Sequence, residues 1–168
     1  MIKYNLRQKI QIKIAMYVMP ILTKILIFHK LNTIIWKFLG VKVGKNSIIR
    51  TGTYINAPFK VEIGNNTIIH GHLKSRGGII IGNNVEFVEN VTISTQSHNI
   101  NSKNFEAIYK PVIIEDECWL SLNCVILQGV ILKKGTVVAA GAVVTKSTEE
   151  CGVYAGIPAK KIKDRICK

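Results

Sequence analysis

The sequence lacks any acidic residue before Glu62, although 23 lysines and arginines give the 168-residue chain a formal charge of +13. Such an excess points to an acidic partner: nucleic acid, an anionic membrane or a phosphate-bearing small molecule. Aromatic residues are scarce, at 7% of the chain, and no base-reading motif accompanies the basic N-terminal part. Nucleic-acid binding is therefore not expected, whereas a membrane or a phosphorylated ligand stays open.

Long apolar runs and Cys-x-x-Cys motifs are missing as well. No uninterrupted apolar stretch approaches the roughly 20 residues of a transmembrane helix, and no secretory segment is evident. The four cysteines form no Cys-x-x-Cys pair, and we interpret them as reduced thiols of a cytoplasmic protein. Cys118 and Cys124 occupy equivalent positions of the repeat described next, and we interpret them as packing residues rather than metal ligands.

The sequence does contain a six-residue repeat, in which an apolar, mostly aliphatic residue returns at every sixth position. We call this series the six-residue beat, and Ser75 is its one polar member. Neither the helical period of about 3.6 nor the strand period of about 2 generates this spacing. Internal repeats at a fixed spacing predict a solenoid, in which short strands stack coil upon coil. The beat runs through Val43, Ile49 and Ile55, and after a two-residue shift through Ile63, Ile69, Ser75, Ile81, Phe87 and Ile93. After a loop it resumes at Ile114, Leu120, Ile126, Leu132, Val138 and Val144.

Glycine and asparagine mark the turns between the predicted strands. They recur in the segments VGKNSI, IGNNTI and IGNNVE, and both residues tolerate the positive φ angles of tight turns. Three such units can close a triangular coil, and stacked coils bury a continuous aliphatic core. The sequence thus predicts a mainly β solenoid over residues 41–150, and chance recurrence in an Ile/Val-rich sandwich is the less favoured alternative.

The solenoid motifs resemble those of a known enzyme family. IGNNTI, IGNNVE and LKKGTV, with AAGAVVTK and VYAGIPAKKIK at the end, are similar to the hexapeptide-repeat acyltransferases, closest to the maltose, galactoside and exopolysaccharide O-acetyltransferase branch. The resemblance covers roughly Val43 to Lys163 and implies a left-handed parallel β-helix. It also implies an acetyl-CoA donor, a saccharide hydroxyl as acceptor, and a homotrimer with active sites between neighbouring subunits. An amino sugar acylated on nitrogen stays open, because a general base serves either nucleophile.

The beat stops at the stretch STQSHNINSKNFEAIYKP, residues 94–111. A smooth solenoid face offers no concavity, so we expect the loop 99–111 to leave the coil and form a wall of the acceptor pocket. His98 is the last in-register position before this loop, where the coil would hold its backbone. The resemblance implies that His98 is the general base that deprotonates the acceptor hydroxyl for direct attack on the thioester.

Polar and aromatic residues near this break are candidates for binding the acceptor. Asn99 follows His98 where a related pattern often has aspartate; an amide cannot stabilise imidazolium as a carboxylate does, so the sequence does not identify the group that orients His98. Asn90 and Asn99 are the polar residues expected beside the acceptor. The resemblance places Trp119 beside the acceptor and the pantetheine arm, and packing against a neighbouring subunit is an equally open role for it.

The C-terminal coils and the tail, residues 151–168, are expected to hold the donor. Small side chains in VVAAGAVVTK let a ligand approach the backbone, and lysines at the end can meet nucleotide phosphates. The resemblance places the backbone at Ala140 near the sulfur and the basic tail near the phosphates, while a solvated basic face is the alternative for the lysines. The residues expected to contact coenzyme A are Trp119, Ala140, Thr145, Lys146, Lys160 and Lys163.

His70 and His72 are competing histidines. A trimeric β-helix can gather histidines into a zinc site, as in the γ-type carbonic anhydrases built on this fold. Such a site needs a histidine triplet with a close pair late in the coil series, and here His98 stands alone. We therefore expect no metal, and a surface or acceptor-pocket position for these two residues.

Residues 1–40 carry apolar side chains at helical spacing, from Ile10 through Ile25 to Phe38, with basic residues between them. Pro20 is expected to break or kink this segment. A basic amphipathic helix pair either caps the open end of the solenoid or lies on an anionic membrane. The second role would fit a non-enzymatic membrane-surface module, or an enzyme whose acceptor is attached to a lipid carrier.

Overall fold

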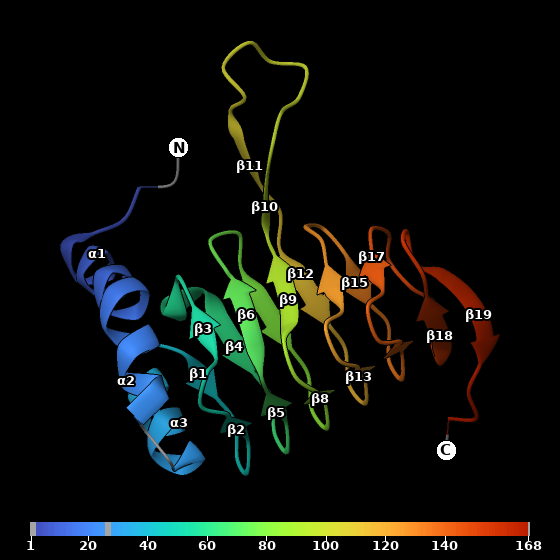
Figure 1. Cartoon of the computed structure of the whole chain (residues 1–168), viewed down its shortest axis with the longest axis horizontal. Coiled ribbons are helices and arrows are strands. Elements are labelled where there is room, and N and C mark those ends of the chain that lie inside the picture. The colour runs from blue at the N-terminus through green and yellow to red at the C-terminus, as the bar shows by residue number, and fades with distance from the viewer. Residues whose placement is uncertain (1–2, 26–27, 168) are drawn as a thin grey trace.

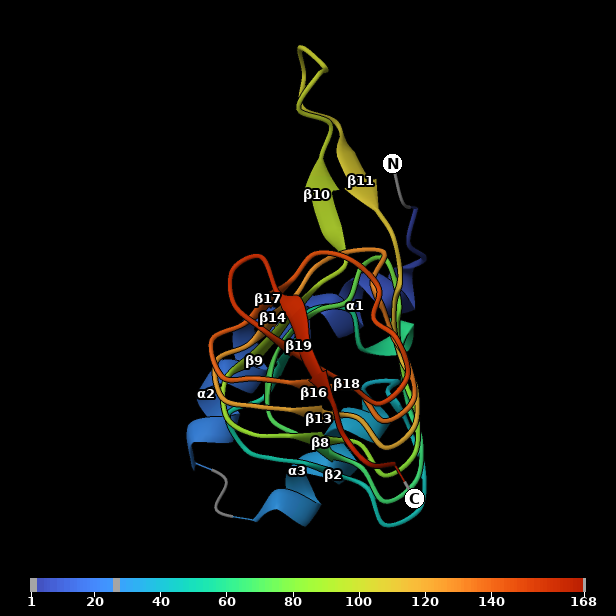
Figure 2. The ribbon, with the colours of Figure 1, turned by 90° about the vertical axis from the view of Figure 1, so that its right-hand side faces the viewer.

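The protein is a β-solenoid whose coils stack along the longest axis of the molecule (Figure 1). The structure is a computed structural model that describes residues 3–25 and 28–167, without the side chains of residues 23–25, so the apolar side chain predicted at Ile25 lies outside it. Strands of successive coils pair in parallel into three sheets, which form the faces of a prism (Figure 2). The predicted fold class, a parallel β-helix of hexapeptide repeats, is confirmed.

Each of five coils contributes one strand to each face. The first face contains β1 (Lys42–Val43), β4 (Val61–Ile63), β7 (Ile79–Ile81), β12 (Val112–Ile114) and β15 (Ile131–Leu132). The second contains β2 (Ile48–Ile49), β5 (Ile68–Ile69), β8 (Glu86–Phe87), β13 (Trp119–Leu120), β16 (Val137–Val138), β18 (Gly152–Ala155) and β19 (Lys160–Asp164). The third contains β3 (Tyr54–Ile55), β6 (Gly71–Lys74), β9 (Val91–Ser94), β14 (Val125–Ile126) and β17 (Val143–Val144).

The six-residue beat supplies the inward-pointing side chains. Parallel pairing aligns equivalent residues of successive coils, so that Phe87, Leu120 and Val138 stack on the second face. All three are fully buried. Because burying a side chain of this kind contributes about 1.5–3 kcal/mol, the aligned column provides much of the driving force for folding.

Asparagines form a ladder along the corner between the first and second faces. Asn46, Asn66 and Asn84 all have positive φ angles, between 52° and 57°. The Nδ2 of Asn46 donates to the Oδ1 of Asn66 at 3.2 Å, and the Nδ2 of Asn66 donates to the Oδ1 of Asn84 at 3.3 Å. The predicted turn role of asparagine is confirmed, and the amides also bond each turn to the next.

Ser75, the polar member of the beat, is fully buried and hydrogen-bonded. Its Oγ donates to the carbonyl oxygen of Ala57 at 3.0 Å, and its backbone N–H donates to the Oδ1 of Asn56 at 2.8 Å. The neighbouring corner of the first coil contains a short 3₁₀ helix, η2 (Pro58–Lys60), in place of a plain turn. A serine suits this position because the irregular backbone beside it needs hydrogen-bond partners.

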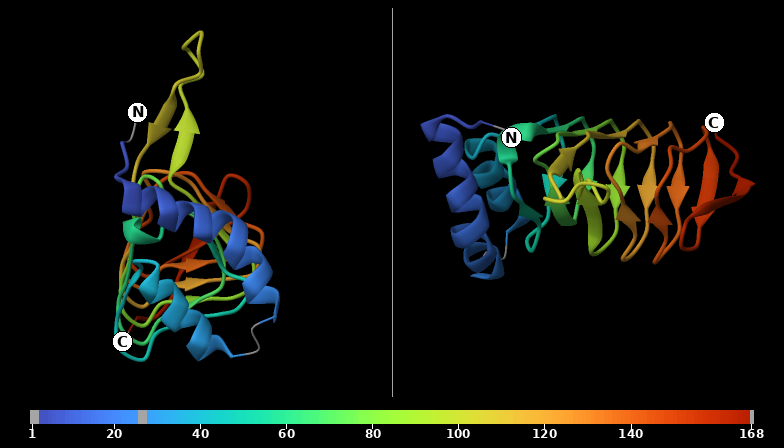
Figure 3. Two further views of the ribbon diagram at one scale, coloured as in Figure 1. Left: turned by 90° about the vertical axis from the view of Figure 1, so that its left-hand side faces the viewer. Right: turned by 90° about the horizontal axis from the view of Figure 1, so that it is seen from above.

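Two helical segments cover the end of the first coil (Figure 3). The first is α1 (Leu6–Lys13), continued by η1 (Ile14–Val18) and α2 (Met19–Ile25), and the second is α3 (His29–Phe38). Asn32 Nδ2 donates to the carbonyl oxygen of Ile49 at 2.9 Å, while the N–H of Ile49 donates to Thr33 Oγ1 at 2.9 Å. Since an open strand edge exposes unpaired backbone groups, these contacts cap the solenoid, which is one of the two roles expected for residues 1–40.

Of the break or kink expected at Pro20, the break is wrong, because α2 continues through this residue. A π-helical turn, η1, immediately precedes the proline, and the N–H of Met19 donates to the carbonyl oxygen of Ile14. A proline removes one backbone donor, and a local change of helical pitch lets the chain absorb that loss. Over the described residues, none of the helices combines the length and apolarity needed to cross a bilayer.

The last strand, β19, pairs antiparallel with β18. This pairing overturns the interpretation of two of the cysteines as reduced thiols. Strand β19 runs back along β18 and sets Asp164 opposite Gly152. Cys151 and Cys167 therefore meet, with Cα atoms 6.0 Å apart, and form a disulfide. Their separation of 16 residues gave no sign of this pairing, because only the return of the chain brings them together. Cys118 and Cys124 are buried free thiols, as the repeat predicted.

Candidate active site

A β-hairpin leaves the solenoid where the sequence interrupts the beat (Figures 1 and 2). It consists of β10 (Gln96–His98) and β11 (Ala107–Tyr109), between β9 of the third coil and β12 of the fourth. The corner between the third and first faces, from which it projects, is called the hairpin corner below. Buried Thr95 anchors its base: the Oγ1 donates to the carbonyl oxygen of Lys74 at 2.6 Å and accepts from the N–H of Gly77 at 2.8 Å.

His98 lies on this hairpin and not on the coil, so the expectation that the coil holds its backbone is wrong. Strand pairing sets His98 opposite Ala107, and the extrusion begins at Gln96 rather than at residue 99. Two strands that pair with each other need not stay in the plane of the coil, and the six-residue count cannot show where they start to do so. The imidazole is exposed at the outer end of β10.

The imidazole of His98 is oriented by a backbone carbonyl. Its Nδ1 lies 2.6 Å from the carbonyl oxygen of Phe105, a residue with a positive φ of 47°. A carbonyl oxygen can only accept, so Nδ1 carries the proton in this contact. In the neutral ring, Nε2 is then left unprotonated and faces away from the contact. This is the tautomer that a histidine base requires.

The carbonyl oxygen of Phe105 is a contact of the candidate site that the sequence did not reveal. Any residue supplies a carbonyl oxygen, so no side-chain signal could have identified it. The hydrogen bond from the N–H of Asn99 to the carbonyl oxygen of Glu106, at 2.9 Å, closes the hairpin end and sets this carbonyl in place. Asn99 thus contributes through its backbone, and its side chain is exposed at the end of the hairpin.

Two of the predicted donor residues share the hairpin corner. Thr145 and Lys146 follow β17 directly, and the register aligns Ile93, Ile126 and Val144 across the third face. Thr145 therefore lies two coils beyond the residue that follows Ile93, which is about 10 Å at the ordinary spacing of strands. Both side chains are exposed.

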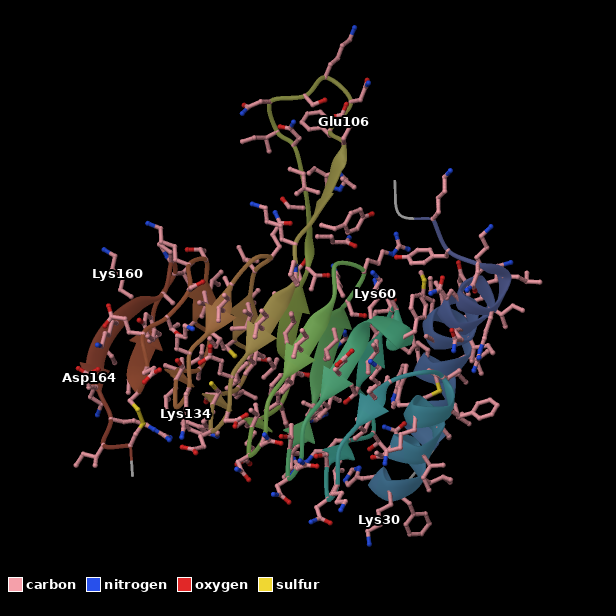
Figure 4. All side chains as sticks on the ribbon, turned by 180° about the vertical axis from the view of Figure 1, so that it is seen from behind. Lys30, Lys60, Glu106, Lys134, Lys160 and Asp164 are labelled. Carbon is pink, nitrogen blue, oxygen red and sulfur yellow. A yellow bond between two sulfur atoms is a disulfide. The ribbon has the colours of Figure 1, made fainter. Side chains whose placement is uncertain are left out.

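The tail lysines lie on β19, at the end of the solenoid remote from the helices (Figure 4). Lys161 is held by Glu149 and Asp164, each at 2.7 Å, and its hydrogen bonds to Asp164 and Glu149 raise the pKa of its ammonium group. Lys160 and Lys163 are exposed, and neither takes part in an ion pair within the described part of the chain. Of the tail lysines that the structure describes, these two are therefore available to an anionic ligand.

The other predicted contacts lie elsewhere on the prism. Asn90 and Ala140 are on the corner between the second and third faces, where Asn90 has a positive φ of 59°. Trp119 lies on the second face, 41% exposed, in register with Glu86 and Val137. A single chain thus brings His98, Thr145 and Lys146 to one corner and leaves Asn90, Ala140 and Trp119 away from it.

The competing histidines lie on the coil. His72 is exposed opposite Tyr54 on the third face, and burial lowers the pKa of His70. Among the residues that the structure describes, no group of three or more histidine, cysteine, aspartate or glutamate side chains is arranged to hold a metal ion.

Two hollows, of about 360 and 470 Å³, lie on the first face of the prism. They share Ile80 and Gly82 in their linings, and neither is lined by His98. The hollow surface of one chain is thus separate from His98, which is exposed on its hairpin.

Comparison with known proteins agrees with this architecture. A family model described as the hexapeptide repeat of succinyl-transferase matches residues 31–57 and 111–146. An Escherichia coli (strain K12) protein, assigned by name to colanic acid biosynthesis as the acetyltransferase WcaF, is 30% identical over 142 residues, which cover 83% of this chain and 78% of that protein. Galactoside O-acetyltransferase of the same organism is 30% identical over 133 residues, covering 76% of this chain and 66% of the relative.

Solved structures share the fold at lower identity. A hexapeptide-repeat acetyltransferase from Vibrio cholerae, crystallised with acetyl coenzyme A, superposes with a TM-score of 0.82 at 23% identity, covering 93% of this chain and 87% of that one. A maltose O-acetyltransferase from Clostridium difficile gives 0.73 at 23% identity, covering 96% and 91% of the two chains. The chain belongs to the hexapeptide-repeat acyltransferase family, and it is an acyltransferase.

Proposed function

We propose that this protein transfers an acetyl group from acetyl-CoA to a sugar hydroxyl of a surface polysaccharide, its precursor or a related saccharide, with His98 as the general base. The observation that carries the proposal is the contact between His98 Nδ1 and the carbonyl oxygen of Phe105. It fixes the tautomer in which Nε2 can accept a proton. The names of the relatives, which act on galactoside or belong to colanic acid biosynthesis, support a carbohydrate acceptor.

The proposed reaction is a direct transfer. His98 Nε2 takes the proton of the acceptor hydroxyl while the hydroxyl oxygen attacks the carbonyl carbon of the thioester. The new C–O bond forms, the C–S bond breaks, and coenzyme A leaves as a thiolate. The imidazolium then returns its proton to the thiolate, so that His98 is neutral for the next cycle. The hairpin, with Asn99 at its end, forms a wall of the acceptor site.

The donor side is supported by unpaired cations and small residues. Lys146, Lys160 and Lys163 are exposed near the C-terminal end, where they can meet the phosphates of coenzyme A. The related structure from Vibrio cholerae contains acetyl coenzyme A on the same fold. Ala140 lets the pantetheine arm approach the backbone, because its side chain is small. Since acetyl-CoA is a cytoplasmic metabolite, the proposal places the reaction in the cytoplasm.

The site is completed between neighbouring subunits of a homotrimer. One chain leaves Asn90, Ala140 and Trp119 away from the hairpin corner, so a second chain must supply these groups if they act with His98. Exposed Trp119 on the second face suits such a contact, because a large aromatic side chain gains most from being covered.

Calorimetry with acetyl-CoA, with zinc assayed in the same sample, tests the proposal. We expect binding in the micromolar range at one site per chain, no stoichiometric zinc, and acetylation of members of a saccharide panel. Absence of acetyl-CoA binding would overturn the proposal. Zinc near one atom per chain would favour the alternative of a γ-type carbonic anhydrase. A panel in which only amino sugars react would keep His98 as base and replace the hydroxyl acceptor by an amine.

A further inference from the structure

The helical cap exposes rows of large apolar side chains on its outer surface, although a solenoid cap normally exposes a polar surface for solubility. Helix α3 buries Asn32 and Trp36 against the first coil, and its opposite side exposes Leu31, Ile34 and Phe38, at helical spacings of three and four residues. Phe38 is 84% exposed. The apolar row is therefore not required by the contact with the solenoid.

The first helical segment repeats this arrangement. It buries Ala15 and Met19 toward the coil. The side chains on its outer row, spaced by four, seven and four residues, are exposed. A groove of about 400 Å³ between α1 and the end of α3, lined among others by Leu6, Ile10 and Phe38, joins the two rows. We call this surface the cap face: Leu6, Ile10, Tyr17, Ile21, Leu31, Ile34 and Phe38.

The charges around the cap face are all positive. No aspartate or glutamate occurs before Glu62. Every ion pair within the described part of the chain joins positions from 42 onward, so the cations of the cap have no carboxylate partner there. The exposed basic side chains of the two helical segments and their flanks are Lys3, Arg7, Lys9, Lys13, Lys30 and Lys37.

We propose that the cap face docks on the surface of an anionic lipid membrane, with its apolar rows inserted at the acyl boundary and its lysines among the headgroups. An apolar face rimmed by basic residues, on helices that lie flat across the end of the molecule (Figure 3), matches the geometry of interfacial helices. Each lysine or arginine near such a surface adds about fivefold to the affinity.

Charge complementarity favours lipid over a second copy of the chain. A symmetric contact between two cap faces would bring two sets of unpaired lysines together without a carboxylate on either side. An anionic bilayer covers the same apolar rows and supplies the counter-charge. This inference goes beyond the proposed acetyl transfer and does not depend on it.

Co-sedimentation of the full-length protein with vesicles tests the proposal. We expect binding to vesicles of phosphatidylcholine with phosphatidylglycerol, little binding to phosphatidylcholine alone, and weakening by salt. Phe38→Ser should lower the partition coefficient at least about tenfold, because a buried phenylalanine side chain is lost. The double variant Lys30→Gln, Lys37→Gln should lower it by about fivefold for each charge removed.

The matched control is Ile166→Ser, which removes an equally exposed apolar side chain, 90% exposed, at the remote end of the solenoid. It should bind vesicles like the wild type. Ile34→Ser provides a second cap-face variant, and circular dichroism verifies that each protein is folded. Equal binding to both kinds of vesicle, or no response to either cap-face variant, would overturn the proposal. Lipid-free self-association that Phe38→Ser abolishes would assign the cap face to a second copy instead.

Discussion

The coils and the hairpin of this protein hold their residues in opposite ways. In the coils, each inward side chain is buried between equivalents above and below, as Leu120 is between Phe87 and Val138. In the hairpin, every side chain from Ser97 to Ala107 except Ser102 is at the surface, and three residue pairs with a few loop bonds define the backbone. The difference separates the buried residues that stabilise the fold from the exposed hairpin that carries His98. The coils can be rigid without constraining this imidazole, and the imidazole can be exposed without weakening the core.

The strongest test of this separation replaces His98, the proposed general base. His98→Ala should lower acetyl transfer by about 10² to 10⁴, the usual loss for a general base, while leaving the thermal unfolding temperature unchanged because the side chain is exposed. Initial rates with acetyl-CoA and calorimetric scans measure the two quantities. His29→Ala, at the start of α3, is the control that removes a histidine from outside the site. Full activity in His98→Ala would remove this residue from the mechanism.

Thiol labelling probes the burial of the coils. Burial raises the pKa of the Cys118 and Cys124 thiols to about 12 from an ordinary 9.0. At pH near 8 their thiolate fractions should be about 10³-fold lower than in the unfolded chain, and labelling correspondingly slower. Without reductant we expect no rapidly labelled thiol in the native protein, and after mild reduction two, from Cys151 and Cys167. Four rapid thiols after mild reduction of the folded protein would show that the coils are open.

Truncating one isoleucine in the coils and one in the hairpin compares the contributions of these two regions to stability. Ile126→Ala removes a fully buried side chain and should lower the free energy of unfolding by about 2–5 kcal/mol. Ile100→Ala, at an 80% exposed position near the end of the hairpin, should change it by no more than about 0.5 kcal/mol. Denaturant titration measures both. Equal losses of unfolding free energy would mean that the hairpin packs against a second molecule.

The smallest effect is expected at the tail. Lys163→Ala should raise the KM for acetyl-CoA about two- to fivefold, the range for an exposed charge contact, with the KM for the acceptor unchanged. Lys45→Ala, an exposed lysine on the first coil, is the matched control. An unchanged KM for acetyl-CoA would take Lys163 out of the donor site and leave the other lysines to be tested.

The sequence predicted the coils better than the site, for a physical reason. Burial repeats at every sixth residue, so the inward column and even the exception at Ser75 were visible as a pattern. The sequence showed no pattern for the π-helical turn before Pro20 or for the return of β19 toward Cys151. Each of these depends on backbone geometry that many side chains allow. The interruption of the beat drew attention to His98 but not to its position on the hairpin, and the carbonyl of Phe105 has no signature in a side chain.

The number of stacked coils also sets the length of the molecule. Ile63 pairs with Ile81, eighteen residues further on, so one additional repeat of that length would lengthen the prism by a single strand spacing, about 4.8 Å. Because the hairpin emerges from the third coil and the tail follows the fifth, the number of coils between them sets the distance from the hairpin to the tail lysines. Evolution could therefore adjust the span available to a long, thin donor by inserting or deleting one repeat, without altering any residue at either end of that span.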